Sequence, residues 1–210
     1  MAVAEASTAE DACAELAAGA ATAADSTATA ATGTVDSADL TRVAILENEI
    51  GEVNIDSSYL TGLTPGRFAL RELFSGCVCC TLSGELADAV KGLQDAIAPQ
   101  WLIIETTGLA EPAKAAEKLR RTTSGLGRLL TIVLVDASRF LVLQKIGALV
   151  DQQVSGADVL LLNKADLVDA AALADLRARL HDLNPSAPVY ETVATRGIGP
   201  ELWRAALQVG

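Results

Sequence analysis

From Arg42 onward the chain alternates short apolar runs with segments of helical periodicity, and this alternation limits the possible folds more than any other feature. Apolar runs bounded by polar residues are typical of buried strands, and strands that alternate with helices are typical of a parallel sheet. We therefore expect an α/β fold: a doubly wound, mostly parallel sheet with helices on both faces. The expected strands contain residues 43–46, 68–74, 101–104, 130–135, 159–162 and 189–190.

Three sequence signals set the expected helices. Asp169 is a good N-cap for the helix that follows the 159–162 run, and Asn184-Pro185 ends that helix. Pro112 fits the first turn of a second helix. A third helix is predicted by apolar residues that recur every three or four positions, namely Leu82, Leu86, Val90, Leu93 and Ile97.

The first forty residues have a different composition from the rest. Residues 1–40 contain sixteen alanines and seven acidic residues but no Lys or Arg, which leaves too little apolar surface to offset the entropy of ordering. We expect residues 1–40 to form a disordered or marginally helical tail, and residues 41–210 to form one domain. The N-terminus has neither the basic nor the apolar region of a signal peptide, so we expect a cytoplasmic protein.

Charge and hydropathy exclude two classes of partner. The net charge is −11, which argues against a nucleic-acid partner. No apolar run approaches the roughly 18 residues that cross a bilayer, so we expect no membrane partner.

Polar segments follow five of the expected strands, and ligands bind at the carboxyl ends of such strands. Asp136 alone is equally well explained as the polar end of a buried strand. The coincidence of five such segments predicts a functional site at this edge of the sheet. The segments are residues 47–52, 75–80, 105–108, 136 and 163–166.

The run Asn163-Lys164-Ala165-Asp166 suits guanine recognition. The Asp166 carboxylate can accept hydrogen bonds from the ring N1–H and the 2-amino group of guanine, while Asn163 and Lys164 hold the loop and the base. Bonds to a charged group contribute roughly 1.5–3 kcal/mol each, which is enough to reject adenine. The alternative is a simple turn that opens a helix, with Asp166 as a cap.

Three of the four cysteines, Cys77, Cys79 and Cys80, lie within four residues. Clustered thiols in a reducing compartment indicate metal binding or redox chemistry, and thiolates suit Zn²⁺, with Co²⁺ as a competitor. Glu47 and Glu52 are the available oxygen donors for the remaining position. The alternative is that the cysteines are small buried residues that line a turn.

Glu105-Thr106-Thr107-Gly108 follows another apolar run. A carboxylate at this position can act on Mg²⁺-bound water or orient an attacking water, as in nucleotide hydrolases. Gly108 would allow close approach to a terminal phosphate. Taken alone, this pattern is common.

Together, residues 47–56, 75–82, 104–112, 131–137 and 161–168 resemble the CobW-type family of GTPases and metallochaperones in content, order and spacing. The resemblance implies a P-loop GTPase-like domain that binds and hydrolyses GTP with Mg²⁺, binds Zn²⁺ or Co²⁺, and delivers the metal to a client metalloprotein. It implies metal ligation by Cys77, Cys79, Cys80, Glu47 and Glu52, guanine binding by Asn163, Lys164 and Asp166, and hydrolysis at Glu105 and Gly108.

One element of that family has no counterpart in the sequence. The family's first strand and P-loop, G-x-x-x-x-G-K-[ST], neutralise and cradle phosphates, whereas the first lysine here is Lys91 and no Gly-Lys-Ser/Thr occurs. Without that strand, we expect the strands that carry Glu105 and Asn163 to lack a neighbour. Two explanations remain: a truncated or misread GTPase, or a non-hydrolysing metal-binding or regulatory relative.

Overall fold

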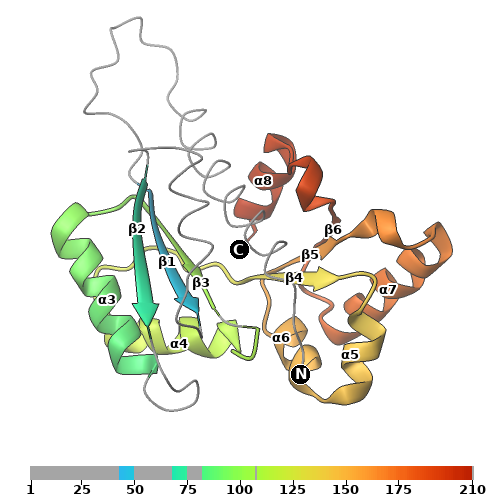
Figure 1. Ribbon diagram of the computed structural model, residues 1–210, viewed down its shortest axis with the longest axis horizontal. Helices are drawn as coiled ribbons and strands as arrows, with labels where there is room; N and C mark the ends of the chain where they lie inside the picture. Colours follow the sequence, from blue (N-terminus) through green and yellow to red (C-terminus); the bar gives the residue numbers. More distant parts are fainter. Residues whose placement is uncertain (1–42, 50–67, 75–81, 107, 210) are drawn as a thin grey trace, which may run out of the picture. The chain divides into compact units, whose positions relative to one another are not determined.

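The computed structural model describes residues 43–49, 68–74, 82–106 and 108–209 (Figure 1). The expected tail, residues 1–40, lies outside these ranges. The chain divides into two compact units, Met1–Gly108 and Leu109–Gly210, and each contains its own parallel sheet. No helix in the described ranges is long and apolar enough to cross a membrane.

The first unit contains a three-stranded parallel sheet in the order β2-β1-β3. Its strands are β1 (Val43–Glu49), β2 (Phe68–Phe74) and β3 (Trp101–Glu105). Helix α3 (Leu82–Ile97) connects β2 to β3 and has the predicted bounds. The predicted apolar face of α3 is confirmed at Leu86, Val90 and Leu93, which are buried together with Ala89, and Ile97 is half-buried.

The second unit contains another three-stranded parallel sheet, in the order β4-β5-β6. The strands are β4 (Ile132–Asp136), β5 (Val159–Asn163) and β6 (Val189–Glu191). Every residue of the central strand β5 is buried, which explains why its sequence is a continuous apolar run instead of an alternating one. The helices of this unit are α4 (Pro112–Thr122), α5 (Phe140–Ile146), α6 (Leu149–Ser155), α7 (Ala170–Leu183) and α8 (Pro200–Leu207).

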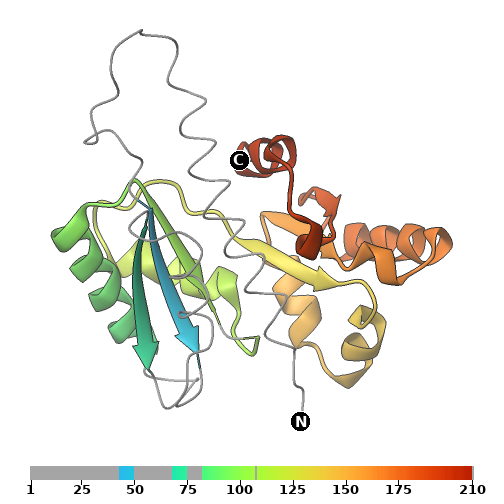
Figure 2. The same cartoon turned by 45° about the horizontal axis from the view of Figure 1, so that its top comes forward.

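The core of the second unit is built on both faces of β5. Leu160 and Leu162 belong to one apolar cluster together with side chains of α5, α6 and α7. Leu161 is equally buried but points to the other face, since side chains alternate along a strand. Figures 1 and 2 place α6 and α8 on opposite sides of this sheet, and α8 contributes the fully buried Trp203.

The predicted helix boundaries of the second unit are confirmed. Pro112 is the first residue of α4. The Asp169 side chain accepts a 2.8 Å hydrogen bond from the Ala172 amide and caps α7. Asn184 ends α7, and its buried side-chain amide nitrogen donates to the carbonyls of Val154 and Ala157. Asn184 therefore also ties the end of α7 to the loop before β5.

One expectation about strand neighbours is wrong. The strand that carries Asn163, β5, has two neighbours, because β4 and β6 pair with it over Ile132–Asp136 and Val189–Glu191. The strand that carries Glu105, β3, pairs with β1 and forms an edge of its sheet within the described residues. Among the described residues, the two edges of the second sheet are formed by β4, the strand that ends at Asp136, and by β6.

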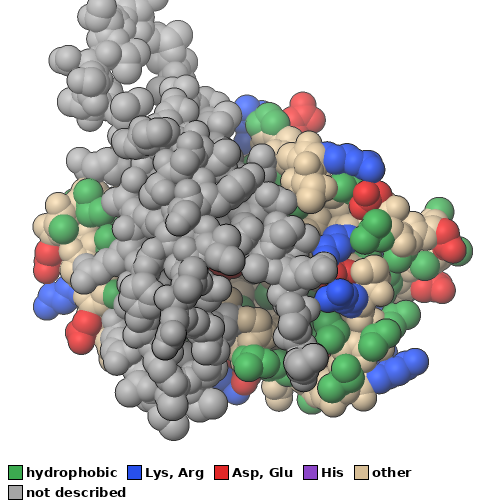
Figure 3. Space-filling model, viewed as in Figure 1, with side chains coloured by type: hydrophobic (Ala, Val, Ile, Leu, Met, Phe, Trp, Pro, Cys, Tyr) green, Lys and Arg blue, Asp and Glu red, His purple; other side chains and the backbone are tan. Residues whose placement is uncertain are grey.

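The surface charges are mixed on the face shown in Figure 3. Lys and Arg side chains lie among Asp and Glu side chains over the described residues of that face, without a broad basic field. Apolar side chains are also exposed on α5, where Leu141, Val142 and Ile146 are each more than half exposed.

Candidate nucleotide-binding site

The loops after β4, β5 and β6 meet at one edge of the second sheet, because the three strands are parallel. Asp136 and Asn163 are register partners at the ends of β4 and β5, and Leu162 is the partner of Glu191 near the end of β6. The Ala137 amide donates to the Asn163 carbonyl at 2.9 Å. The predicted residues Asn163, Lys164 and Asp166 therefore lie beside Asp136 and beside the segment that follows β6.

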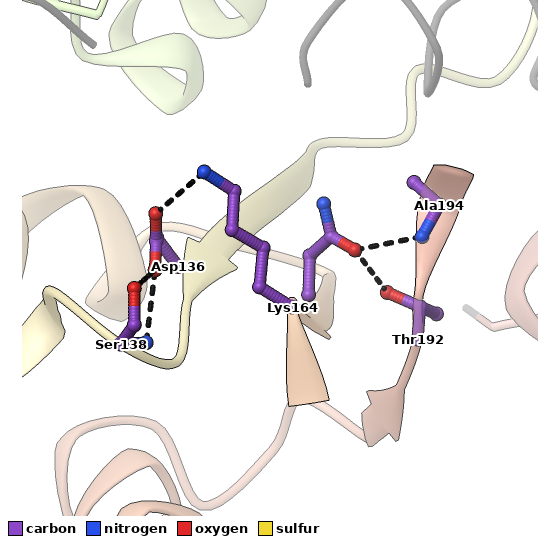
Figure 4. Close-up of polar contacts among 6 residues, drawn as sticks. Asp136, Ser138, Lys164, Thr192 and Ala194 are labelled. Atoms are coloured by element: carbon purple, nitrogen blue, oxygen red, sulfur yellow. Dashed lines mark hydrogen bonds and ion pairs between the residues drawn. The ribbon is translucent and has the colours of Figure 1, made fainter. Parts of the chain in front are cut away.

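Asn163 holds the loop after β6 in place. Its side chain is buried, and its Oδ1 accepts hydrogen bonds from the Ala194 amide at 2.9 Å and the Thr192 hydroxyl at 3.3 Å (Figure 4). The Ala165 amide in turn donates to the Thr192 carbonyl at 3.2 Å. Asn163 thus acts as a brace between two loops.

Lys164 is bound to the end of β4. Its backbone is left-handed, with φ 59° and ψ 34°, a conformation that is uncommon for a residue other than glycine. Its ammonium lies 3.1 Å from Oδ2 of Asp136 (Figure 4), and both side chains are mostly buried. The charged end of Lys164 is therefore fixed on a neighbouring loop.

Asp136 is the counter-ion of Lys164. Its Oδ1 accepts hydrogen bonds from the Ser138 amide at 2.8 Å and the Ser138 hydroxyl at 2.6 Å. Burial acts to raise the pKa of Asp136, but the bonds from Ser138 and the nearby Lys164 charge outweigh it, so the pKa lies below its ordinary value. Asp136 is therefore ionised at neutral pH and has a role beyond that of a polar strand end.

Asp166 is the most exposed of the three polar side chains of the loop. It lies in the short 3-10 helix η2 (Ala165–Leu167), where the adjacent Leu167 is well exposed. Its Oδ2 pairs with the Arg196 guanidinium at 3.1 Å, and the Asp166 side chain is 30% exposed. Arg196 lies in a second 3-10 helix, η3 (Ala194–Arg196). All three side chains thus contact neighbouring loops, but Asp166 is the most exposed of the three, and its Oδ1 has no hydrogen-bond partner among the described residues.

Sequence reasoning missed Thr192, Ala194 and Arg196 as members of this cluster. The rule that polar residues follow strands could have found Thr192, which comes two residues after the predicted 189–190 run. Arg196 gives no such signal, because its partner Asp166 is thirty residues away and the pairing depends on how β6 lies beside β5.

The predicted hydrolysis residues belong to the first unit. Glu105 is the last residue of β3 and is half-buried. Gly108 is exposed, and a Cβ at this position would meet no atom within 4 Å, so packing within the protein does not require glycine there. The proposed roles of Glu105 and Gly108 stay predictions.

The predicted metal ligands fall largely outside the described residues. This applies to Cys77, Cys79, Cys80 and Glu52. Glu47 is described at the backbone level only: it lies in β1 and is the register partner of Glu105 in β3. Within the described ranges, no three His, Cys, Asp or Glu side chains gather as a metal site would require.

Magnesium, which the family resemblance implies, does not fit the one carboxylate buried in the nucleotide-site cluster. Both oxygens of Asp136 are already bonded, one to Ser138 and the other to the Lys164 ammonium. A cation next to the carboxylate disfavours a second cation at the same place.

The parallel α/β architecture, with an N-K-x-D loop at the end of a central strand, is that of the P-loop GTPase-like fold class. The chain belongs to the CobW/HypB/UreG nucleotide-binding domain family, whose model matches residues 28–191. This membership confirms the resemblance that the loop segments carried.

Two relatives illustrate the family. The zinc chaperone YjiA of Escherichia coli strain K12 is 32% identical over 157 residues, which cover 71% of this chain and 48% of that protein. The zinc-regulated GTPase metalloprotein activator 1 of Dictyostelium discoideum is 30% identical over 185 residues, which cover 70% of this chain and 38% of that protein. The chain therefore spans about half or less of the length of these relatives.

Solved structures share the fold. The hydrogenase maturation factor HypB from Archaeoglobus fulgidus superimposes with a TM-score of 0.54 at 19% identity, covering 80% of this chain and 74% of that one. The Zn(II)-bound YjiA GTPase from E. coli gives a TM-score of 0.51 at 22% identity, covering 77% of this chain and 60% of that one. These likenesses confirm the predicted fold class.

Proposed function

We propose that this chain is a guanine-nucleotide-binding metallochaperone domain that hydrolyses GTP, binds Zn²⁺ or Co²⁺, and delivers the metal to a client metalloprotein. Family membership supports the class of activity. The observation that carries guanine recognition is that the polar side chains of the Asn163–Asp166 loop differ in their contacts and exposure. Asn163 and Lys164 bind neighbouring loops through mostly buried side chains, whereas Asp166 is partly exposed and is paired at Oδ2 with the exposed Arg196 side chain.

The hydrogen-bonding pattern of the base explains why a carboxylate at this place selects guanine. The N1–H and 2-amino groups of guanine are adjacent donors, and an ionised carboxylate offers two adjacent acceptors. Adenine presents an acceptor at N1, which would face the carboxylate without a donor. The charge on Asp166 therefore favours guanine and penalises adenine.

The metal and hydrolysis parts of the proposal rest on the residues of the first unit. Cys77, Cys79 and Cys80 supply soft thiolate ligands, with oxygen ligands from Glu47 and Glu52. Glu105 would orient the attacking water next to the γ-phosphate, and Gly108 would leave space for that phosphate.

The decisive test of base recognition is Asp166→Asn in the full chain. Asparagine keeps one acceptor and replaces the other by a donor, so it fits xanthine, which has a carbonyl in place of the 2-amino group. We expect GDP affinity to fall about 10- to 100-fold, from the loss of a charge-assisted bond, and xanthosine diphosphate affinity to rise. Isothermal titration calorimetry measures both affinities.

Asp169→Asn is the matched control for that test. It removes the same charge three residues away, and asparagine caps a helix as well as aspartate does, so α7 keeps its cap. GDP affinity should therefore stay unchanged in the control. If Asp166→Asn and Asp169→Asn had the same effect on GDP and xanthosine diphosphate, Asp166 would not read the base.

A second function, a metal-binding or regulatory module without hydrolysis, is favoured by the lack of any Gly-Lys-Ser/Thr in the sequence. The two functions differ in GTP turnover, measured as phosphate release with and without zinc. Turnover above background supports the GTPase, and zinc binding without turnover supports the module. In both cases, the combined Cys77→Ser, Cys79→Ser and Cys80→Ser variant should lose zinc binding, whereas Cys13→Ser should keep it.

A further inference from the structure

The ion pair between Arg196 and Asp166 occupies the carboxylate that the proposed function assigns to guanine. The Nη2 atom of Arg196 lies 3.1 Å from Oδ2 of Asp166. Within the described part of the chain, the other oxygen, Oδ1, has no hydrogen-bond partner. The Arg196 side chain is 70% exposed, so the guanidinium can swing into solvent when another donor takes its place.

The backbone that carries Arg196 is held by the same loop that contains Asp166. Oδ1 of Asn163 accepts from the Ala194 amide, the first residue of η3, at 2.9 Å. The Arg196 amide then donates to the Val193 carbonyl at 2.8 Å. Gly197, with φ 82°, ends the turn directly after Arg196. Arg196 is therefore presented to Asp166 by a fixed backbone, even though its side chain is exposed.

The Arg196 guanidinium and the Watson–Crick edge of guanine present the same kind of hydrogen-bond donors to the Asp166 carboxylate. Each is planar and presents adjacent N–H donors, and each can bond to both oxygens of a carboxylate. Guanine needs both Asp166 oxygens for its N1–H and its 2-amino group. Hypoxanthine lacks the 2-amino group and needs one oxygen only.

We infer that Arg196 is a specificity-determining residue that competes with the 2-amino group of guanine for Asp166. This inference rests on the proposed guanine-binding role of Asp166. Guanine displaces Arg196 from Oδ2, whereas hypoxanthine binds Oδ1 and leaves the pair between Arg196 and Asp166 intact. The wild-type protein therefore discriminates less between guanine and hypoxanthine than its carboxylate alone would.

The strength of the ion pair between Arg196 and Asp166 determines how much the GDP affinity changes when Arg196 is removed. Exposed ion pairs are weak, and losing one corresponds to about a two- to fivefold change in an equilibrium constant. Removing the competitor in Arg196→Ala should tighten GDP binding about two- to fivefold. Inosine diphosphate binding should not tighten, because that base does not displace Arg196.

The test compares GDP and inosine diphosphate on the full chain by isothermal titration at one ionic strength. The variants are wild type, Arg196→Ala and Arg177→Ala. Arg177 is the matched control, since it forms another exposed pair of the same unit, with Glu191 at 3.3 Å. The deciding quantity is the ratio of the two affinities, because a general loss of positive charge near the phosphates would weaken both nucleotides equally.

We expect the preference for GDP over inosine diphosphate to rise about two- to fivefold in Arg196→Ala and to stay constant in Arg177→Ala. An unchanged preference in Arg196→Ala overturns the inference, even where wild type prefers GDP to ADP and the proposed function stands. A wild-type protein that binds GDP no better than ADP removes the proposed guanine site, and the inference with it.

A second measurement follows the side chain directly. The Nε–Hε resonance of Arg196 in the NMR spectrum should shift when GDP is added and stay in place when inosine diphosphate is added at equal saturation. The same shift with both nucleotides would mean that displacement does not depend on the 2-amino group, and this outcome also overturns the inference.

Discussion

Replacing Asn163 by alanine should destabilise the protein by about 2 kcal/mol, because the brace between two loops would be lost. The Asn163 side chain is 4% exposed and accepts the Ala194 amide at 2.9 Å. Ala194 is equally buried, so its amide would have no partner after the substitution. A buried donor left unsatisfied costs roughly 1–3 kcal/mol.

The second bond to Asn163 contributes much less. The Thr192 hydroxyl lies 3.3 Å from the Asn163 Oδ1, which is long for a hydroxyl donor. Thr192→Val keeps the side-chain shape and removes only that donor. We therefore expect Thr192→Val to cost less than about 0.5 kcal/mol, well below a normal net hydrogen bond.

Urea denaturation of wild type, Asn163→Ala and Thr192→Val measures both free energies of unfolding. The reasoning requires the alanine variant to lose at least about 1 kcal/mol more than the valine variant. Equal losses would refute it, because they would show that the Ala194 amide finds another partner. GDP affinity should also fall in Asn163→Ala, since η3 would no longer be fixed beside Asp166.

Two further predictions concern the second unit. The pKa of Asp136 is lowered in the folded protein, so its ionised form adds stability at neutral pH that is lost as the pH falls below about 4. Wild type should therefore be more stable than Asp136→Asn at pH 7 in urea denaturation, and a difference that stays constant down to pH 3 would contradict this. An ideal Cβ on Gly156 would lie 2.6 Å from the Ala113 Cβ, so Gly156→Ala should cost about 1–3 kcal/mol. Gly147→Ala, where the new Cβ meets nothing within 4 Å, should not lower the melting temperature, and equal losses in both variants would contradict the packing argument.

The long elements of the fold could be predicted from the sequence because their signals are local. The apolar face of α3 repeats over sixteen residues, and its bounds match the prediction. The fully apolar run of β5 likewise identifies a central strand. The helices α5 and α6 could not be predicted, because each has only seven residues and shows no repeat of its apolar face. Strand β1 extends three residues past its apolar run, since backbone pairing with β2 and β3 does not depend on side-chain polarity.

The same distinction applies to the candidate site: residues that are consecutive in the sequence could be predicted, and contacts between distant residues could not. The loop Asn163–Asp166 could be predicted, because four consecutive residues carry its chemistry. The sequence also placed Asp136 at the same edge, but not its ion pair with Lys164. The contact with Arg196 could not be predicted, because Arg196 reaches Asp166 only through strand pairing across thirty residues. The wrong expectation about the neighbours of β5 has the same cause: a sequence without an alignment contains no signal for which strands pair.

Zinc binding should affect GTP hydrolysis, because Glu47 and Glu105 occupy neighbouring positions of the first sheet. Glu47 in β1 has two register partners, Glu105 in β3 and Glu72 in β2, and adjacent strands lie about 4.8 Å apart. If Glu47 binds zinc and Glu105 orients water, the charge of a divalent ion at the first position attracts the carboxylate at the second and changes its hold on that water. Zinc should then change GTP turnover, and Glu47→Gln should remove that dependence. Glu72→Gln is the control, because Glu72 is equally close to Glu47 but has no assigned metal role, so zinc dependence should persist. If Glu72→Gln lost the zinc dependence and Glu47→Gln kept it, the metal would lie on the β2 side of β1, and Glu47 would not be its ligand.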